Sequence, residues 1–323
     1  MHIAIVGDGI GGRTLYRILK MRKVVVDLYG RKKHTKCKIR PCGYGTSASC
    51  VYLLKVLGIS PEKYVLCHDD YIIMDGRKIK GELYWIDKPQ LLRTIANSIQ
   101  YDKPFLDNYD LVVDATGIER AYSPQIAKFD DKKVICYQHR IILKEHITPA
   151  FDTIRGGYLW TIPLGEKEAH IGGGSSVLES GSIEQLVLRR VQEIRPSEII
   201  CSCCEPIRLS GPIFPLVNGR VVTIGEAAGL VVPFGGAGIQ TAVESAIILA
   251  DTMNKDNIKK YDKFMTKRFG WLGNVKNIID RLERGQLPFF SLGNSYRALR
   301  YQGLKPTLMD LLHIRKSLVK ANR

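Results

Sequence analysis

His2-Ile3-Ala4-Ile5-Val6-Gly7-Asp8-Gly9-Ile10-Gly11-Gly12, followed by the run from Arg13 to Met21, is the stretch that decides the fold. Residues 2–6 form a short apolar run typical of a buried strand, and 13–21 predicts a helix. The glycines of the GxGxxG pattern, Gly7, Gly9 and Gly12, would permit a tight turn, the approach of a pyrophosphate and close helix–strand packing. The helix N-terminus would then face the phosphates. With a second strand expected at 24–29, this context predicts a dinucleotide-binding fold; the alternative is a glycine-rich turn without a ligand.

The end of the second strand departs from the usual pattern. An acidic residue is expected there to accept the ribose hydroxyls, but the sequence has Gly30 followed by Arg31. Asp27 comes too early, inside the strand. We therefore expect ribose recognition by backbone atoms or by Arg31, and cofactor affinity could be reduced.

Two later segments repeat the strand-to-turn design. An apolar run at 109–113 ends in Asp114-Ala115-Thr116-Gly117, where the backbone must pass close to something. Residues 219–224 lead into Gly225-Glu226-Ala227-Ala228-Gly229, then into the glycine-rich start, Gly235-Gly236-Ala237-Gly238-Ile239, of a helix expected at 240–253. Glu226 can accept a hydroxyl, and amides around 236–239 can face an anionic or electron-rich ring edge.

Tyr158 and Trp160 alternate in an expected strand, so they would line one face of it. The ordinary interpretation is an aromatic core pair. Because a turn at 163–165 follows and residues 170–174 would return as a hairpin partner, we favour a cavity wall.

Composition and charge describe a globular protein with a basic surface. The 323 residues are 45% hydrophobic and 25% charged, with a net charge of +16 concentrated in 13–40 and 296–323. Nucleic acid, an anionic membrane surface or an acidic electron-donor protein would each fit that charge, as would a solvated surface with no partner. The absence of an RNA-binding motif or a Cys/His finger argues against nucleic acid. No apolar run approaches the ~20 residues of a spanning helix and no signal peptide precedes Ile3, so we expect a cytoplasmic protein.

Cys201, Cys203 and Cys204 are the cysteines that suggest a metal. They lack a second CxxC or HxxxH pair, so we predict no metal and expect core thiols or one local disulfide. If this segment is a strand, adjacent Cys203 and Cys204 would point in opposite directions.

Together the three glycine-rich elements resemble the FAD-binding core of the p-hydroxybenzoate-hydroxylase-like flavoproteins. Within that group the chain is similar to the geranylgeranyl reductase family, which includes the archaeal digeranylgeranylglycerophospholipid reductases. Pro41-Cys42-Gly43-Tyr44-Gly45 resembles the CGxG loop of that family, and Trp85-Ile86-Asp87-Lys88 resembles its segment leading into a helix. Gly157-Tyr158-Leu159-Trp160-Thr161-Ile162-Pro163 resembles its YxWxFP signature with Ile162 for Phe, and 225–229 resembles GDAAG with Glu226 for Asp.

This resemblance implies an α/β fold with a Rossmann-like FAD-binding domain, an antiparallel-sheet substrate domain and a short helical C-terminus. It implies discontinuous FAD-binding segments at 1–60, 86–125 and 205–257, substrate-domain segments at 61–85 and 126–204, and a helical region at 258–323. Tyr158, Trp160 and Pro163 would bind substrate. The residues expected around the FAD are Gly7, Gly9, Gly11, Gly12, Arg31, Gly43, Asp114, Gly117, Gly225, Glu226, Gly235, Gly236, Gly238 and Ile239.

The implied activity is reduction of carbon–carbon double bonds in an isoprenoid lipid, with hydride from reduced FAD and a proton from Cys42 or water. Cys42 could instead be a small residue chosen to fit against the ring. NADPH or ferredoxin would bind transiently as electron donor, because no second nucleotide fingerprint is present. The basic C-terminal helix could lie on a membrane or pack on its own domain. A flavin monooxygenase or halogenase is an alternative, since one fold serves several chemistries, and so is a degenerate, non-catalytic binding protein.

Overall fold

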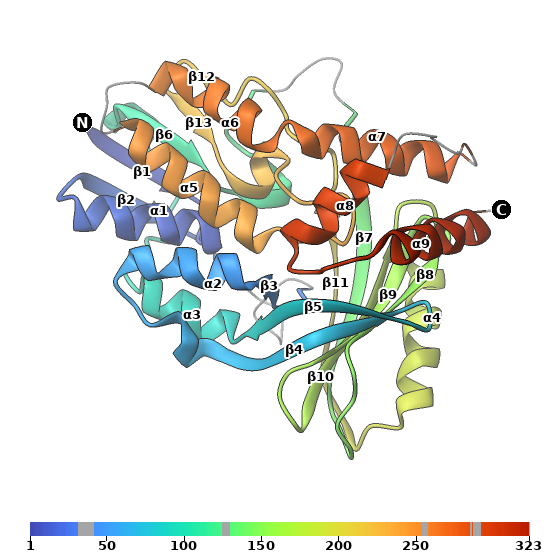
Figure 1. Cartoon of the computed structure of the whole chain (residues 1–323). Helices are drawn as coiled ribbons and strands as arrows, with labels where there is room; N and C mark the ends of the chain where they lie inside the picture. The colour runs from blue at the N-terminus through green and yellow to red at the C-terminus, as the bar shows by residue number, and fades with distance from the viewer. Residues whose placement is uncertain (32–41, 125–129, 254–257, 285, 287–291, 323) are drawn as a thin grey trace.

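The computed structural model describes residues 1–31, 42–124, 130–253, 258–284, 286 and 292–322. Its chain forms two sheets with helices around them (Figure 1). The resulting mixed α/β class, with a large antiparallel region and helices at the C-terminal end, is the class predicted from the sequence.

The first sheet carries the N-terminal glycine-rich turn. Its order is β12-β13-β6-β1-β2, formed by Val217–Asn218, Val221–Thr223, Leu111–Asp114, His2–Val6 and Val25–Tyr29. The four strands other than β12 run parallel, so their carboxyl ends meet at one edge. The turns after β1, β6 and β13, which the sequence singled out, are therefore neighbours in space.

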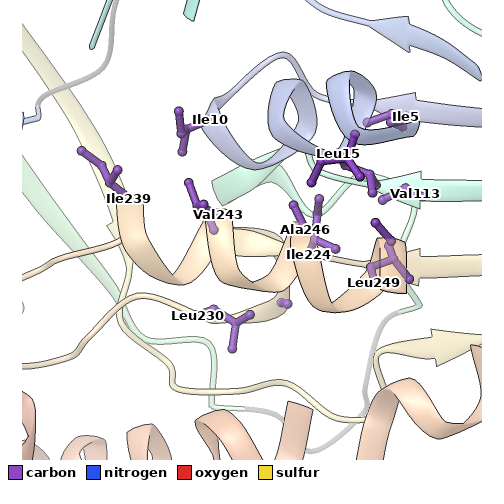
Figure 2. Packing of buried hydrophobic residues seen from close by; sticks show 14 of the residues in the cluster. Ile5, Ile10, Leu15, Val113, Ile224, Leu230, Ile239, Val243, Ala246 and Leu249 are labelled. Carbon is purple, nitrogen blue, oxygen red and sulfur yellow. The ribbon is translucent and has the colours of Figure 1, made fainter. Parts of the chain in front are cut away.

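Two helices pack together beside this sheet. Helix α1 spans Ile10–Met21 and α5 spans Ile239–Met253. Leu15 of α1 and Val243 and Ala246 of α5 are among the buried apolar side chains between them (Figure 2). A Cβ at Gly11 would lie 3.3 Å from the carbonyl oxygen of Ala242, so this glycine allows the close approach of α1 and α5.

The second sheet is mainly antiparallel, in the order β11-β7-β10-β9-β8-β4-β5-β3. In the same order, its strands are Glu198–Arg208, Lys133–Ile142, Glu168–Ser175, Gly157–Pro163, Ala150–Ile154, Val65–Met74, Arg77–Ile86 and Gly45–Ser47. Strand β3 lies within the segment 1–60 expected in the FAD-binding domain, yet it pairs with β5 of this second sheet. The two predicted domains are thus interlocked, and their boundaries stay a prediction.

The remaining helices connect and cover the sheets. They are α2 (Ala48–Leu54), α3 (Lys88–Ile95), α4 (Ser180–Ile194), α6 (Tyr261–Phe269), α7 (Trp271–Glu283), α8 (Leu292–Tyr301) and α9 (Leu308–Ala321). Helix α4 covers β7 and β10, and α9 lies against β8 (Figure 1). Within the described parts of the chain, no helix combines the length and apolar character needed to cross a membrane.

Strand β11 carries the cysteine cluster. Cys201 is disulfide-bonded, while Cys203 and Cys204 are free thiols. Cys203 is buried and Cys204 is exposed, as expected for neighbours on opposite faces of a strand.

Candidate functional site

The GxGxxG turn has two glycines required by packing and one that faces open space. Gly7 has φ 121°, and a Cβ there would lie 2.0 Å from the carbonyl oxygen of Ala115. A Cβ at Gly12 would lie 1.9 Å from the carbonyl oxygen of Gly7. A Cβ at Gly9, in contrast, has no neighbour within 4 Å in the part of the chain that the structure describes. Gly9 is the N-cap of α1 and brings no capping side chain, so the first-turn amides of α1 can receive an anionic group.

The turn after β6 is held by a fully buried carboxylate. Asp114 Oδ1 accepts hydrogen bonds from the amide and hydroxyl of Thr116 (3.1 and 2.6 Å). Its Oδ2 accepts from the amides of Tyr122 and Ser123 and from the Ser123 hydroxyl (2.9, 2.8 and 2.7 Å). Asp114 therefore shapes this turn, which includes Gly117 at φ 67°. Its direct contact with a cofactor stays a prediction.

The turn after β13 is anchored to the second sheet. Glu226 Oε1 accepts a hydrogen bond from the backbone amide of Arg208 at 2.9 Å. The buried Arg208 side chain donates to Asp131 Oδ1 at 2.6 Å. Burial opposes ionisation of Asp131, but the hydrogen bond and charge of Arg208, with hydrogen bonds from Ser210 and Lys133, together outweigh it and lower the pKa of that carboxyl to about 2. Oε1 of Glu226 is thus engaged within the protein, and the contact of Glu226 with a cofactor hydroxyl stays a prediction.

A central cavity of about 180 Å³ brings together predicted residues from distant parts of the chain. Cys42 and Gly43 line it from the loop before β3, and Tyr158 and Trp160 from β9. The stretch 235–239 closes it at the start of α5, where Gly235 and Gly236 have φ of 97° and 66°. Gly236 also makes room for Tyr158, because a Cβ there would lie 2.9 Å from the phenolic oxygen.

An outer cavity of about 100 Å³ adjoins the central one. Tyr158, Trp160 and Phe234 are among the residues that line both cavities. The outer cavity continues between α7 and α9, where Leu282 and Leu318 contribute to its wall. Its lining is mostly aliphatic and aromatic, which suits an apolar ligand.

The wall of the central cavity is braced from behind. Ser47 Oγ donates to Gln240 Oε1 at 2.7 Å, and Gln240 Nε2 donates to Glu244 Oε1 at 2.8 Å. The same Glu244 oxygen accepts from the Tyr301 hydroxyl at 3.0 Å, and its other oxygen accepts from Arg268 Nε at 2.6 Å. This network ties β3, α5, α6 and α8 together around the cavity.

Tyr44 and His170 were not predicted as site residues, yet both are unusual. Tyr44 has φ 61° and lines the central cavity, and its buried hydroxyl has no hydrogen-bond partner among the described residues. Its ring meets the His170 ring edge-on, with centroids 4.6 Å apart. Within the described parts of the chain, buried His170 Nδ1 likewise has no hydrogen-bond partner. Burial raises the pKa of Tyr44 above its ordinary value, and burial, assisted by Arg140, lowers the pKa of His170 to about 3.

The predicted site residues Cys42, Arg31 and Pro163 differ in their surroundings. Lys88 Nζ donates to Cys42 Sγ at 3.3 Å. Arg31 is exposed and forms an ion pair with Glu119. Pro163 is buried, but it belongs to the lining of neither cavity; its carbonyl accepts from Cys67 Sγ at 3.5 Å. Pro41 of the quoted loop lies outside the described residues.

Comparison with known proteins gives named relatives. No protein-family model matches the chain. The geranylgeranyl diphosphate reductase of Synechocystis sp. is 24% identical over 356 residues, covering 87% of this chain and 85% of that protein. The digeranylgeranylglycerophospholipid reductase 1 of Methanococcoides burtonii is 28% identical over 183 residues, covering 52% of this chain and 43% of that protein.

Solved structures share the fold at low identity. A geranylgeranyl bacteriochlorophyll reductase-like protein from Thermoplasma acidophilum has a TM-score of 0.73 at 16% identity, with 98% of both chains covered. Klebsiella pneumoniae HpxO, solved with FAD and uric acid, has a TM-score of 0.66 at 14% identity, covering 98% of this chain and 97% of its own.

The topology and the three clustered turns define the class by its fold, which is the fold of FAD-dependent hydroxylases and reductases. Within that class, the chain is a homologue of the geranylgeranyl reductases, which confirms the resemblance inferred from the sequence motifs. Monooxygenases of this class are related to the chain only distantly, through the fold.

Proposed function

We propose that this protein binds FAD and reduces carbon–carbon double bonds of an isoprenoid lipid. The observation that carries the proposal is the pair of adjoining cavities, whose aromatic and aliphatic walls begin beside the Cys42 loop and the start of α5. An isoprenoid chain long enough to extend through both cavities would place one of its double bonds near the Cys42 loop and the start of α5. The names of the homologues support a substrate of this class.

The residues fit the group that the fold implies. Open space at Gly9 and the uncapped start of α1 would hold the pyrophosphate. Gly43 and the turn at 235–239 border the central cavity, where the ring system would lie. When bound and reduced, FAD supplies the hydride of the reaction.

The chain itself would position the alkene, exclude water and deliver a proton. Trp160 is held in place because its indole N–H donates to Gln138 Oε1 at 3.1 Å. The face of the indole would orient the isoprenoid chain of the substrate. The apolar lining keeps the reacting bond dry. As hydride adds to one alkene carbon, the other carbon takes a proton from the Cys42 thiol, beside Lys88, or from water.

Electron supply and membrane contact extend the proposal. We propose NADPH or ferredoxin as the transient donor that re-reduces the flavin. Exposed Leu308, Met309 and Leu312 on α9 support contact with an anionic membrane surface, in keeping with the net charge of +16. Co-sedimentation with anionic but not with neutral vesicles tests that contact.

The test begins with the absorbance spectrum of the purified protein, followed by anaerobic dithionite reduction and addition of a geranylgeranyl lipid. We expect a flavin spectrum that bleaches on reduction and recovers with the lipid. NADPH-stimulated oxygen uptake with an aromatic substrate would favour the monooxygenase instead. A colourless protein that binds no added FAD would favour the degenerate binding protein.

A matched pair of glycine variants tests the location of the cofactor. Gly9→Val should fold but bind FAD roughly tenfold more weakly or worse, because its Cβ would have no described protein atom within 4 Å and its side chain would fill the space left for the pyrophosphate. Gly181→Val is the control, since a Cβ there is equally unobstructed and lies at the start of α4. Flavin fluorescence titration measures both. Equal affinity in Gly9→Val and wild type would place the pyrophosphate elsewhere.

A further inference from the structure

The position where the fold usually carries its ribose-binding acid has no room for a side chain in this protein. A Cβ on Gly30 would lie 2.7 Å from Ile99 Cγ2 and 2.9 Å from Asp8 Cγ. The backbone cannot move away easily, because the Gly30 amide donates to the carbonyl of Gln100 at 2.8 Å. Glycine is therefore required at position 30 as long as Asp8 stays where it is.

The group that occupies this space is itself a carboxylate. The Gly7 amide donates to the carbonyl of Tyr29 at 2.8 Å, which draws the glycine-rich turn onto the end of β2 and places Asp8 beside Gly30. Asp8 Oδ2 lies 3.1 Å from Arg13 Nη2. Its Oδ1 has no hydrogen-bond partner among the residues that the structure describes.

Arg13 holds the Asp8 carboxylate in a fixed orientation. Its Nε donates to the Asp8 carbonyl at 2.8 Å, and its Nη1 donates to the carbonyls of Leu92, at 2.9 Å, and Ala96. The guanidinium is thus anchored at the C-terminal end of α3 independently of the Asp8 side chain. The largely buried guanidinium of Arg13 contacts Oδ2 of Asp8. Oδ1 of the same carboxylate is therefore available to a ligand.

We propose that Asp8 replaces the missing acid and accepts hydrogen bonds from the ribose hydroxyls of the adenosine half of FAD. This inference rests on the proposed FAD binding and adds the residue that recognises the ribose. An ionised carboxylate only accepts hydrogen bonds, which is the chemistry that two neighbouring hydroxyl donors require. In this protein the acid lies in the glycine-rich turn and not at the end of β2. Glycine at position 30 leaves the space that the Asp8 side chain occupies.

Moving the acid back is the decisive experiment. The dissociation constant for FAD is measured by flavin fluorescence in wild type, Asp8→Ala, Gly30→Glu and the double variant. We expect Asp8→Ala to weaken binding roughly tenfold or more. Gly30→Glu alone should also weaken binding, because two carboxylates then crowd one space. The double variant should recover most of the wild-type affinity, since its glutamate occupies the vacated position once the Ile99 side chain rotates its Cγ2 away.

The outcomes separate this inference from the proposed function. A wild-type protein that binds no FAD would end the proposed function itself. Wild-type affinity in Asp8→Ala, or a double variant no tighter than Asp8→Ala, would overturn the role of Asp8 and leave it as the partner of Arg13 alone. If Asp8→Ala does not fold, Asp8→Asn is titrated with FAD and with its 2′,3′-dideoxyadenosine analogue. Wild type should prefer FAD roughly tenfold. Asp8→Asn should lose most of that preference, because Arg13 would take the amide oxygen and leave the NH₂ group facing the hydroxyls. Equal preference in both proteins would overturn the proposal.

Discussion

His170, a single residue behind the wall of the central cavity, should make the protein sensitive to pH. Its imidazole is buried, and burial, with the Arg140 charge opposite it on β7, lowers its pKa from 6.5 to about 3. Between these values the unfolded chain binds one proton more than the folded chain. The free energy of unfolding therefore falls as the pH falls, by roughly 1.4 kcal/mol per pH unit from this residue.

Replacing His170 should remove that contribution. Between pH 7 and pH 5, wild type should lose about 2 kcal/mol more stability than His170→Gln. Urea unfolding at the two pH values measures the difference, and His139, also lowered in pKa by burial, contributes equally to both proteins. If the free energy of unfolding fell equally with pH in both proteins, the folded protein would accept a proton on His170 at no cost in stability.

At the same scale, the sequence predicted residues whose role is local and left out those that depend on distant contacts. Gly12 is required by the carbonyl of Gly7 within the same turn, so the GxGxxG pattern was sufficient to predict it, whereas the contact that requires Gly7 comes from Ala115 on a neighbouring strand end. Tyr44 and His170 are far apart in sequence and meet only because the loop before β3 lies over β10. The sequence does contain an acid inside the GxGxxG pattern, Asp8, and lacks one at Gly30. That the two positions are neighbours follows only from the distance between them in the folded chain.

At the scale of elements, strand pairing explains a glycine run that the sequence showed only as a hairpin partner. Strand β10 pairs antiparallel with β9 and sets Gly172 opposite Trp160. A Cβ on Gly172 would lie 2.4 Å from the Trp160 ring. The glycine therefore lets the indole lie flat against the sheet and face both cavities, a consequence of register that the spacing of residues alone does not determine.

Helix α9 has one face on the outer cavity and one face in solvent, so substitutions on the two faces distinguish an effect on the cavity from an effect on the surface. Leu318 lines the outer cavity, whereas Leu312 is exposed and lines neither cavity. Leu318→Trp should narrow the cavity and lower kcat/KM for a C20 substrate roughly tenfold or more, with a smaller effect on a C10 analogue. On the same helix, Leu312→Trp should leave both values unchanged when both substrates are supplied in detergent micelles, which keeps membrane contact by Leu312 out of the comparison. Lipid-dependent flavin reoxidation measures them, and equal losses for both chain lengths would exclude the outer cavity as the chain-binding site.

At the scale of the whole molecule, the two sheets share the elements that enclose the central cavity. Strand β3 pairs with the second sheet, while its Ser47 joins the hydrogen-bond network of Gln240 and Glu244 on α5. In α8, Ala298 packs in the core of the first sheet and Leu299 in that of the second. A ligand bound in this cavity therefore contacts both halves, and its binding energy should stabilise them together.

This arrangement predicts that flavin release and unfolding of the second sheet occur in one transition. Of the three tryptophans, Trp85 and Trp160 lie in the second core and Trp271 in the first. In Trp271→Phe, the wavelength of the indole emission maximum therefore reports the exposure of Trp85 and Trp160 as the second sheet unfolds, while flavin fluorescence reports release from the site. FAD at 100 times its dissociation constant should add about 2.7 kcal/mol to the stability seen by both probes. If FAD shifted the flavin signal and left the tryptophan transition unmoved, the halves would unfold independently, and the cavity between them would not be the FAD site.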